Sequence, residues 1–108
     1  MVAEISNVVE FASAVKSQER ELVIIDFFAD WCGPCKRIAP FFEELATKYP
    51  NVGFYKINTD NMEINEIIGA CKIEQLPTFC IFYKGEYKEK MTGINILELE
   101  NLINKYFI

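Results

Sequence analysis

The segment that most constrains the fold is residues 21–49, where a strand pattern gives way to a helix pattern within a few residues. Residues 21–29, ELVIIDFFA, are dense in branched and aromatic side chains, which is typical of a strand buried at the centre of a sheet. A buried strand followed at once by an amphipathic helix predicts an α/β fold. After Pro34, the apolar residues that carry the helical spacing are Ile38, Phe41, Phe42, Leu45, Ala46 and Tyr49.

The remaining segments continue this alternation of strands and helices. A short strand that ends near Ile5 precedes a helix that begins at Ser6 or Asn7 and reaches Gln18. The order βαβαβαββα predicts a central mixed β-sheet, parallel in the middle, with an antiparallel hairpin at one side and helices on both faces. The elements expected in the second half are strands at 52–58, 78–83 and 87–92 and helices at 62–71 and 96–106.

Length and composition narrow the class of protein. The 108 residues contain no repeat and no long linker, so we expect a single domain over residues 1–108 and a monomer. A net charge of -5 disfavours nucleic acid as a partner, because phosphate binding requires clustered Lys and Arg. The N-terminus has no signal-peptide pattern and the longest apolar run is too short to cross a bilayer, so we expect a cytoplasmic protein with no membrane partner.

The clearest chemical motif is CGPC at residues 32–35, in a chain that has four cysteines and no histidine. Cys32 falls at the first turn of the predicted helix, where unpaired backbone N–H groups stabilise a thiolate without a neighbouring base. Cys35 lies one turn further on the same face, within the usual span of a disulfide. Gly33 permits a tight entry turn, and Pro34 suits the early helix, where its missing N–H costs least. The spacing therefore favours a dithiol that can open and close.

Two other uses of the motif remain open at this point. A structural disulfide is disfavoured in a reducing compartment. A zinc site would need Cys71 and Cys80 as further ligands, and their spacing is not that of the usual short knuckle, so we expect no metal. Asp26 is a separate signal, because a lone carboxylate within VIIDFF is expected to be desolvated and to have a raised pKa.

Several motifs together resemble the thioredoxin family over essentially the whole chain. They are DFFADWCGPCK at 26–36, KINTD at 56–60, QLPTF at 75–79, and the glycines Gly85 and Gly93. The resemblance implies the thioredoxin fold and a protein disulfide reductase. The reductase would accept electrons from NADPH through thioredoxin reductase, would act on disulfide-containing proteins, and would bind no cofactor itself. Such a protein takes part in electron transport and cell redox homeostasis.

The resemblance also implies roles for individual residues. Cys32 would be the exposed nucleophile and Cys35 the buried resolving thiol of a redox-active disulfide. Asp26 would accept the proton of Cys35 through water, and Lys56 would tune Asp26. Pro77 would follow a cis peptide bond, and the backbone of Leu76 and Pro77 would pair with an extended substrate segment. The residues expected to bind substrate are Trp31, Gly33, Pro34, Thr59, Leu76, Pro77, Thr92, Gly93 and Ile94.

Phe28 stands where many family members have a second tryptophan, and Cys71 and Cys80 are additional cysteines. Cys71 suggests a regulatory or intermolecular bond, whereas Cys80, within a strand, is expected to be an inert core residue. Two alternatives to a reductase remain: an oxidant or isomerase within redox chemistry, and a non-catalytic interaction module that uses the same fold.

Overall fold

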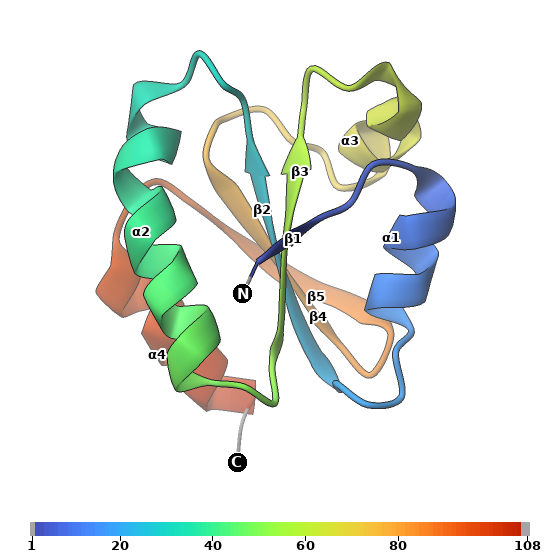
Figure 1. Cartoon of the computed structure of the whole chain (residues 1–108). Coiled ribbons are helices and arrows are strands. Elements are labelled where there is room, and N and C mark those ends of the chain that lie inside the picture. Colours follow the sequence, from blue (N-terminus) through green and yellow to red (C-terminus); the bar gives the residue numbers. More distant parts are fainter. Residues whose placement is uncertain (1, 107–108) are drawn as a thin grey trace.

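The computed structural model describes residues 2–106 and contains the predicted order of elements (Figure 1). None of the helices in that range has both the length and the apolar character needed to cross a membrane. The elements are β1 Ala3–Glu4, α1 Val8–Val15, β2 Leu22–Phe28, α2 Gly33–Lys48, β3 Gly53–Asn58, the 3-10 helix η1 Met62–Ile64, α3 Asn65–Ala70, β4 Thr78–Tyr83, β5 Glu86–Thr92 and α4 Ile96–Tyr106.

The strands form one sheet in the order β1-β3-β2-β4-β5. The β1–β3 and β3–β2 pairs are parallel, whereas β4 is antiparallel to both β2 and β5. Lys84 and Gly85 have φ values of 54° and 81°, as the two-residue turn of a tight hairpin requires. The predicted mixed sheet, with its hairpin at one side, is therefore confirmed.

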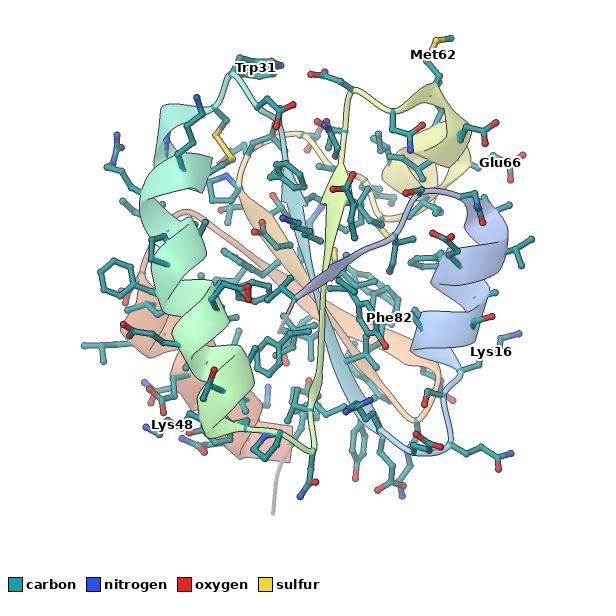
Figure 2. The ribbon with its side chains drawn as sticks, in the orientation of Figure 1. Lys16, Trp31, Lys48, Met62, Glu66 and Phe82 are labelled. Atoms are coloured by element: carbon teal, nitrogen blue, oxygen red, sulfur yellow. A yellow bond between two sulfur atoms is a disulfide. The ribbon has the colours of Figure 1, made fainter. Side chains whose placement is uncertain are left out.

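Helices cover both faces of the sheet, with α2 and α4 on one face and α1 and α3 on the other (Figure 1). Successive strand residues point to opposite faces, so β2 contributes to two cores. Ile24 packs on the α2 side with Phe42 and Phe79, whose ring centroids are 5.3 Å apart. Ile25 packs on the other side, in the core that includes Phe82 beneath α1 (Figure 2). Asp26 is two residues after Ile24 in the same strand, so its side chain also points to the α2 side of the sheet.

Two predicted helices have different limits in the structure. The first ends at Val15, not at Gln18, because the polar residues that follow have no apolar side chain to bury. The predicted helix at 62–71 is divided into η1 and α3. The Asn61 side chain accepts from Glu63 N at 3.0 Å to begin the 3-10 turn, and donates to Ser6 O at 2.8 Å.

Candidate active site

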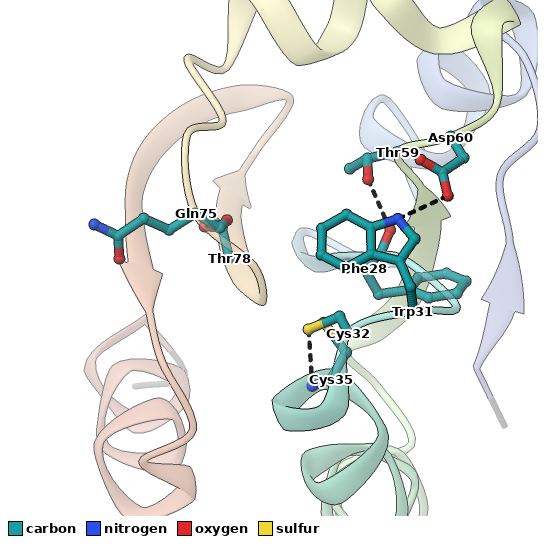
Figure 3. Close-up of a disulfide and its surroundings, with 8 residues drawn as sticks. All are labelled: Phe28, Trp31, Cys32, Cys35, Thr59, Asp60, Gln75 and Thr78. Carbon is teal, nitrogen blue, oxygen red and sulfur yellow. Dashed lines mark hydrogen bonds between the residues drawn. A yellow bond between two sulfur atoms is a disulfide. The ribbon is translucent and has the colours of Figure 1, made fainter.

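The two motif cysteines lie at the carboxyl end of β2, where α2 begins (Figure 3). Cys32 is the N-cap residue of α2, and Cys35 N donates to Cys32 Sγ at 3.2 Å. The two residues form a disulfide with their Cα atoms 5.3 Å apart. The predicted position of Cys32, beside the free N–H groups of a helix start, is thus confirmed. The Cα separation lies within the span over which a disulfide forms.

Both cysteines are buried in this disulfide form, so the expectation that Cys32 is exposed is wrong here. Cys32 is 5% exposed and Cys35 4% exposed, a difference too small to separate a nucleophile from a resolving thiol. The physical reason is that Cys32 Sγ is bonded to Cys35, and both pack with Ala29, Phe28 and Leu76.

The Leu76–Pro77 peptide bond is cis, as the resemblance implies. Hydrogen bonds fix this segment from two sides: Thr78 Oγ1 donates to Gln75 O at 2.6 Å, and Gly93 N donates to Pro77 O at 3.1 Å. Gly93 has a φ of 97°, in the region that favours glycine. Leu76, which packs against the cysteine pair, is therefore held in place by neighbours from β4 and from the end of β5.

Trp31 is the most exposed aromatic side chain at this end of the molecule, with 72% of its surface accessible (Figures 2 and 3). Its indole Nε1 donates to Asp60 Oδ2 at 3.1 Å. Thr59 Oγ1 donates to Phe28 O at 3.1 Å, which ties the end of β3 to the end of β2. Asp60 was not among the residues predicted for the site. The position of Asp60 just after a strand that is parallel to β2 could have identified it, because sites in such sheets form at the carboxyl ends of the strands.

The residues predicted to bind substrate come together from separate parts of the chain. They lie at the carboxyl ends of β2, β3 and β5 and at the amino end of β4, which meet at one edge of the sheet. Exposed apolar surface at this edge comes from Trp31 and Ile94, and Met62 of η1 is exposed at the same end of the molecule (Figure 2). Those brought together are Trp31, Gly33, Pro34, Thr59, Leu76, Pro77, Thr92, Gly93 and Ile94.

Asp26 is buried, with 4% of its surface accessible. Its Oδ1 atom accepts no hydrogen bond from any residue in the range 2–106. Burial raises the pKa of Asp26 to about 7, and the positive charge of Lys56 opposes that rise. Lys56 is the residue opposite Asp26 in the parallel β2–β3 pairing, and its Nζ lies 5.6 Å from the centre of the Phe28 ring. The predicted desolvated carboxyl is therefore present.

Asp26 and Cys35 line the same cavity, which has a volume of about 150 Å³. A cavity of this size with charged walls has room for water. A larger hollow of about 540 Å³ lies beside Lys16, Glu21 and Lys84, but neither a cysteine nor a buried acid lines it. The cavity is lined by Asp26, Phe28, Ala29, Asp30, Cys35, Lys36, Ala39 and Lys56.

The four cysteines do not form one cluster. Cys32 and Cys35 belong to a small core at the start of α2, whereas Cys71 and Cys80 belong to the core beneath α1 and α3. Within residues 2–106 no three side chains of the metal-binding kinds gather at one point. The geometry of the first pair fits reversible disulfide chemistry.

Comparisons with known proteins agree with this geometry. The sequence profile of the thioredoxin family matches residues 2–105. Thioredoxin 1 of Plasmodium falciparum is 42% identical over 106 residues, which cover 98% of each chain. Human thioredoxin is 38% identical over 105 residues, covering 97% of this chain and 98% of the relative. A solved structure of Plasmodium falciparum thioredoxin superposes with a TM-score of 0.87 at 41% identity, covering 97% of this chain and 99% of the other.

Proposed function

This chain belongs to the thioredoxin family and is a thiol-disulfide oxidoreductase, and from that premise we propose how its residues perform dithiol–disulfide exchange. The Cys32 thiolate attacks one sulfur of a substrate disulfide and displaces the other as a thiolate. Cys35 then attacks Cys32 in the mixed disulfide, which releases the second substrate thiol. The substrate gains two electrons, and the protein is left with the Cys32–Cys35 disulfide.

The observation that carries this proposal is the position of Cys32 at the N-cap of α2, with Cys35 in the first turn of the same helix. The N–H of Cys35 points at Cys32 Sγ from 3.2 Å, and partial positive charge at a helix start favours a sulfur anion there. Cys35 is in the same molecule at a Cα distance of 5.3 Å, so its attack on the mixed disulfide is intramolecular and strongly favoured over attack by free thiols.

Asp26 is proposed to accept the proton that Cys35 loses. Both residues line the cavity of about 150 Å³, in which water can carry the proton between them. A carboxyl with a pKa of about 7 exchanges protons readily near neutral pH. Lys56 is proposed to keep the pKa of Asp26 from rising further, since its charge favours the ionised carboxylate.

Substrate binding is proposed at the edge of the sheet that surrounds the disulfide. The backbone of Leu76 and Pro77 would pair with an extended substrate segment, as an added strand does. Exposed apolar side chains at Trp31 and Ile94 support this assignment, because an unfolded or extended segment can bury them. The remaining contacts are assigned to Gly33, Pro34, Thr59, Thr92 and Gly93.

The wider setting is proposed by analogy with the family. We assign residues 1–108 to a single domain that acts as a monomer, in the cytoplasm, in electron transport and cell redox homeostasis. Its electrons would come from NADPH through thioredoxin reductase, and no cofactor would be bound by the chain itself. Support for this part comes from membership of the thioredoxin family.

The test is reduction of a disulfide-containing protein with NADPH and a thioredoxin reductase. Cys32→Ser is expected to abolish NADPH consumption, and Cys35→Ser is expected to accumulate a mixed disulfide that can be detected by mass spectrometry. A reduction potential near about -270 mV, the value typical of thioredoxins, is expected for the Cys32/Cys35 couple. A potential above about -200 mV would assign an oxidant or isomerase. Full biological activity of the Cys32→Ser/Cys35→Ser double variant would assign an interaction module.

A further inference from the structure

The loop between α3 and β4 begins with a backbone conformation that is rare for a residue with a side chain. Cys71 is the C-cap residue of α3, and Lys72 follows it with a φ of 53°. In this left-handed region the Cβ atom crowds the following carbonyl oxygen. Ile73 N then donates to Ile68 O at 3.1 Å, which closes the end of the helix. Such a turn persists where neighbouring groups stabilise it.

A lysine of β5, the last strand in the order of the sheet, stabilises this turn. Lys90 is opposite Cys80 in the antiparallel β4–β5 pairing, and Cys80 belongs to the core on the α1 and α3 side. Opposite residues of an antiparallel pair point to the same face, so Lys90 extends towards α3. Its Nζ donates to Cys71 O at 3.3 Å and to Lys72 O at 2.6 Å. An ammonium group suits these carbonyls, because the C-terminal end of a helix carries partial negative charge.

The same strand holds the other end of the loop. Gly93, directly after β5, donates its backbone N–H to Pro77 O at 3.1 Å. The loop is therefore fastened twice, by Lys90 where it leaves α3 and by Gly93 where it enters β4. Between these two points lies Leu76, which packs against the active-site disulfide.

We infer that Lys90 is a positioning residue for substrate binding. Its two hydrogen bonds hold residues 71–77 in the conformation in which the backbone of Leu76 pairs with an extended protein segment. The inference rests on the proposed function, which places the substrate along Leu76 and Pro77. A loop released at one end occupies the pairing conformation for only part of the time, and the apparent affinity falls by that fraction. The chemical step is unaffected, because the Lys90 bonds go to the start of the loop and not to the cysteine pair.

This role separates two kinds of substrate. A protein disulfide in an extended segment uses the backbone beside Leu76, as an added strand does. A small aromatic disulfide, dithiobis(nitrobenzoic acid), has no peptide backbone to pair with the loop. Loss of the Lys90 bonds is therefore expected to weaken binding of the protein and to leave the reaction with the small disulfide unchanged.

The kinetic test compares Lys90→Met with Lys88→Met, a matched change on the same strand at a lysine whose Nζ donates to Glu86 Oε1 at 3.1 Å. Insulin is the protein disulfide, reduced with NADPH and a thioredoxin reductase. Lys90→Met is expected to raise the KM for insulin about 3- to 10-fold and to keep kcat within about 2-fold. Lys88→Met is expected to match the unsubstituted chain. Lys90→Arg, which can donate to both carbonyls, is expected to recover most of the affinity.

Amide hydrogen exchange tests the structural step without a substrate. The amides of Lys72 and Ile73, which donate to Gly69 O and Ile68 O, are expected to exchange about 3- to 10-fold faster in Lys90→Met. The amides of β2 are expected to keep the rates of the unsubstituted chain, which also shows that the variant has folded.

Several results would overturn the inference. They are an unchanged KM for insulin in Lys90→Met, an equal loss with the small disulfide, unchanged exchange at Lys72 and Ile73, and faster exchange throughout β2, which would show a general loss of stability. An unsubstituted chain that reduces neither disulfide would remove the proposed function and the inference together. Normal turnover by the unsubstituted chain with an unchanged KM in Lys90→Met would remove the inference alone.

Discussion

Asp26 in β2 and Cys35 in α2 face one cavity of about 150 Å³, although nine positions separate them in the sequence. Alternate side chains of a strand point to the same face of the sheet, so Asp26 lies on the α2 side together with Ile24. A carboxyl that is buried for catalysis also lowers the stability of the fold when it ionises. Activity and stability are therefore coupled through one side chain.

Removal of this carboxyl is expected to stabilise the protein at alkaline pH. The pKa of Asp26 is about 7 in the folded state and 3.8 in its ordinary state, so the unfolded chain ionises first as pH rises. Stability is then lost between these two values, by on the order of 4 kcal/mol, and is unaffected below the lower one. Urea unfolding of Asp26→Asn should show a gain of up to that size near pH 8 and little change near pH 4. An equal effect at both pH values would contradict the assignment.

The same substitution is expected to slow release of the substrate. Loss of a general base costs about 100-fold or more in the step that it assists. We expect Asp26→Asn to slow attack of Cys35 on a preformed mixed disulfide to this extent, and to remove the part of the pH dependence that is centred near 7. Stopped-flow single turnovers provide the measurement. Unchanged resolution with an unchanged pH profile would exclude Asp26 as the proton acceptor.

Replacement of Lys56 is expected to raise the pKa of Asp26, because the Lys56 charge is what opposes the effect of burial. Lys56→Met keeps most of the aliphatic chain that packs near Phe28 and removes only the ammonium group. Carboxyl chemical shifts in an NMR titration report the midpoint directly, with Asp26→Asn as the assignment control. A midpoint that stays the same or falls would contradict the role of Lys56.

The bond between Trp31 and Asp60 is expected to affect substrate binding more than folding. Asp60→Ala removes the acceptor for the indole Nε1 on an exposed surface, so the free energy of unfolding should fall by less than about 1 kcal/mol. The KM for a protein disulfide should rise several-fold with little change in kcat, because the freed indole no longer has a fixed orientation. Glu44→Ala, which removes an exposed acid of α2 outside the site, serves as the matched control. A change in kcat alone would show that Asp60 does not act by positioning Trp31.

Substitution of two adjacent phenylalanines of α2 tests which face of the helix stabilises the fold. Phe42 is 2% exposed and its ring centroid lies 5.3 Å from those of both Phe54 and Phe79, whereas Phe41 is 49% exposed. Phe42→Ala is expected to cost about 3–5 kcal/mol of unfolding free energy, and Phe41→Ala about 1 kcal/mol or less. Similar losses from both substitutions would contradict the packing described here. Thermal or denaturant unfolding provides the comparison.

The sequence predicts the elements well because their apolar patterns are local. The dense apolar run of β2 and the helical spacing after Pro34 are visible in short windows, and each is satisfied by burial on the sheet. The limits of α1 and of η1 with α3 were less predictable, since they depend on side-chain caps such as Asn61. The cis bond before Pro77 came from the family resemblance, because most bonds to proline are trans.

The parts of the site that escaped prediction depend on contacts between distant segments. Burial of Cys32 results from packing against Leu76, and the Asp60 contact results from the parallel alignment of β2 and β3. Cys71 and Cys80 belong to one core although Cys71 lies at a helix end and Cys80 in a strand, a relationship that neither local pattern encodes. The prediction that Cys80 belongs to a core was confirmed, but the residues that surround it there could be found only in three dimensions.

Trp31 is the only tryptophan in the chain and lies next to the Cys32–Cys35 disulfide, on the outside of the fold. Phe28, which packs against the same cysteine pair, contributes no indole emission. Selective excitation of tryptophan therefore reports on the site alone, free of background from the core. Opening of the disulfide, arrival of a substrate and loss of the bond to Asp60 should each change its intensity or wavelength, so the protein contains its own spectroscopic reporter for every step of the cycle.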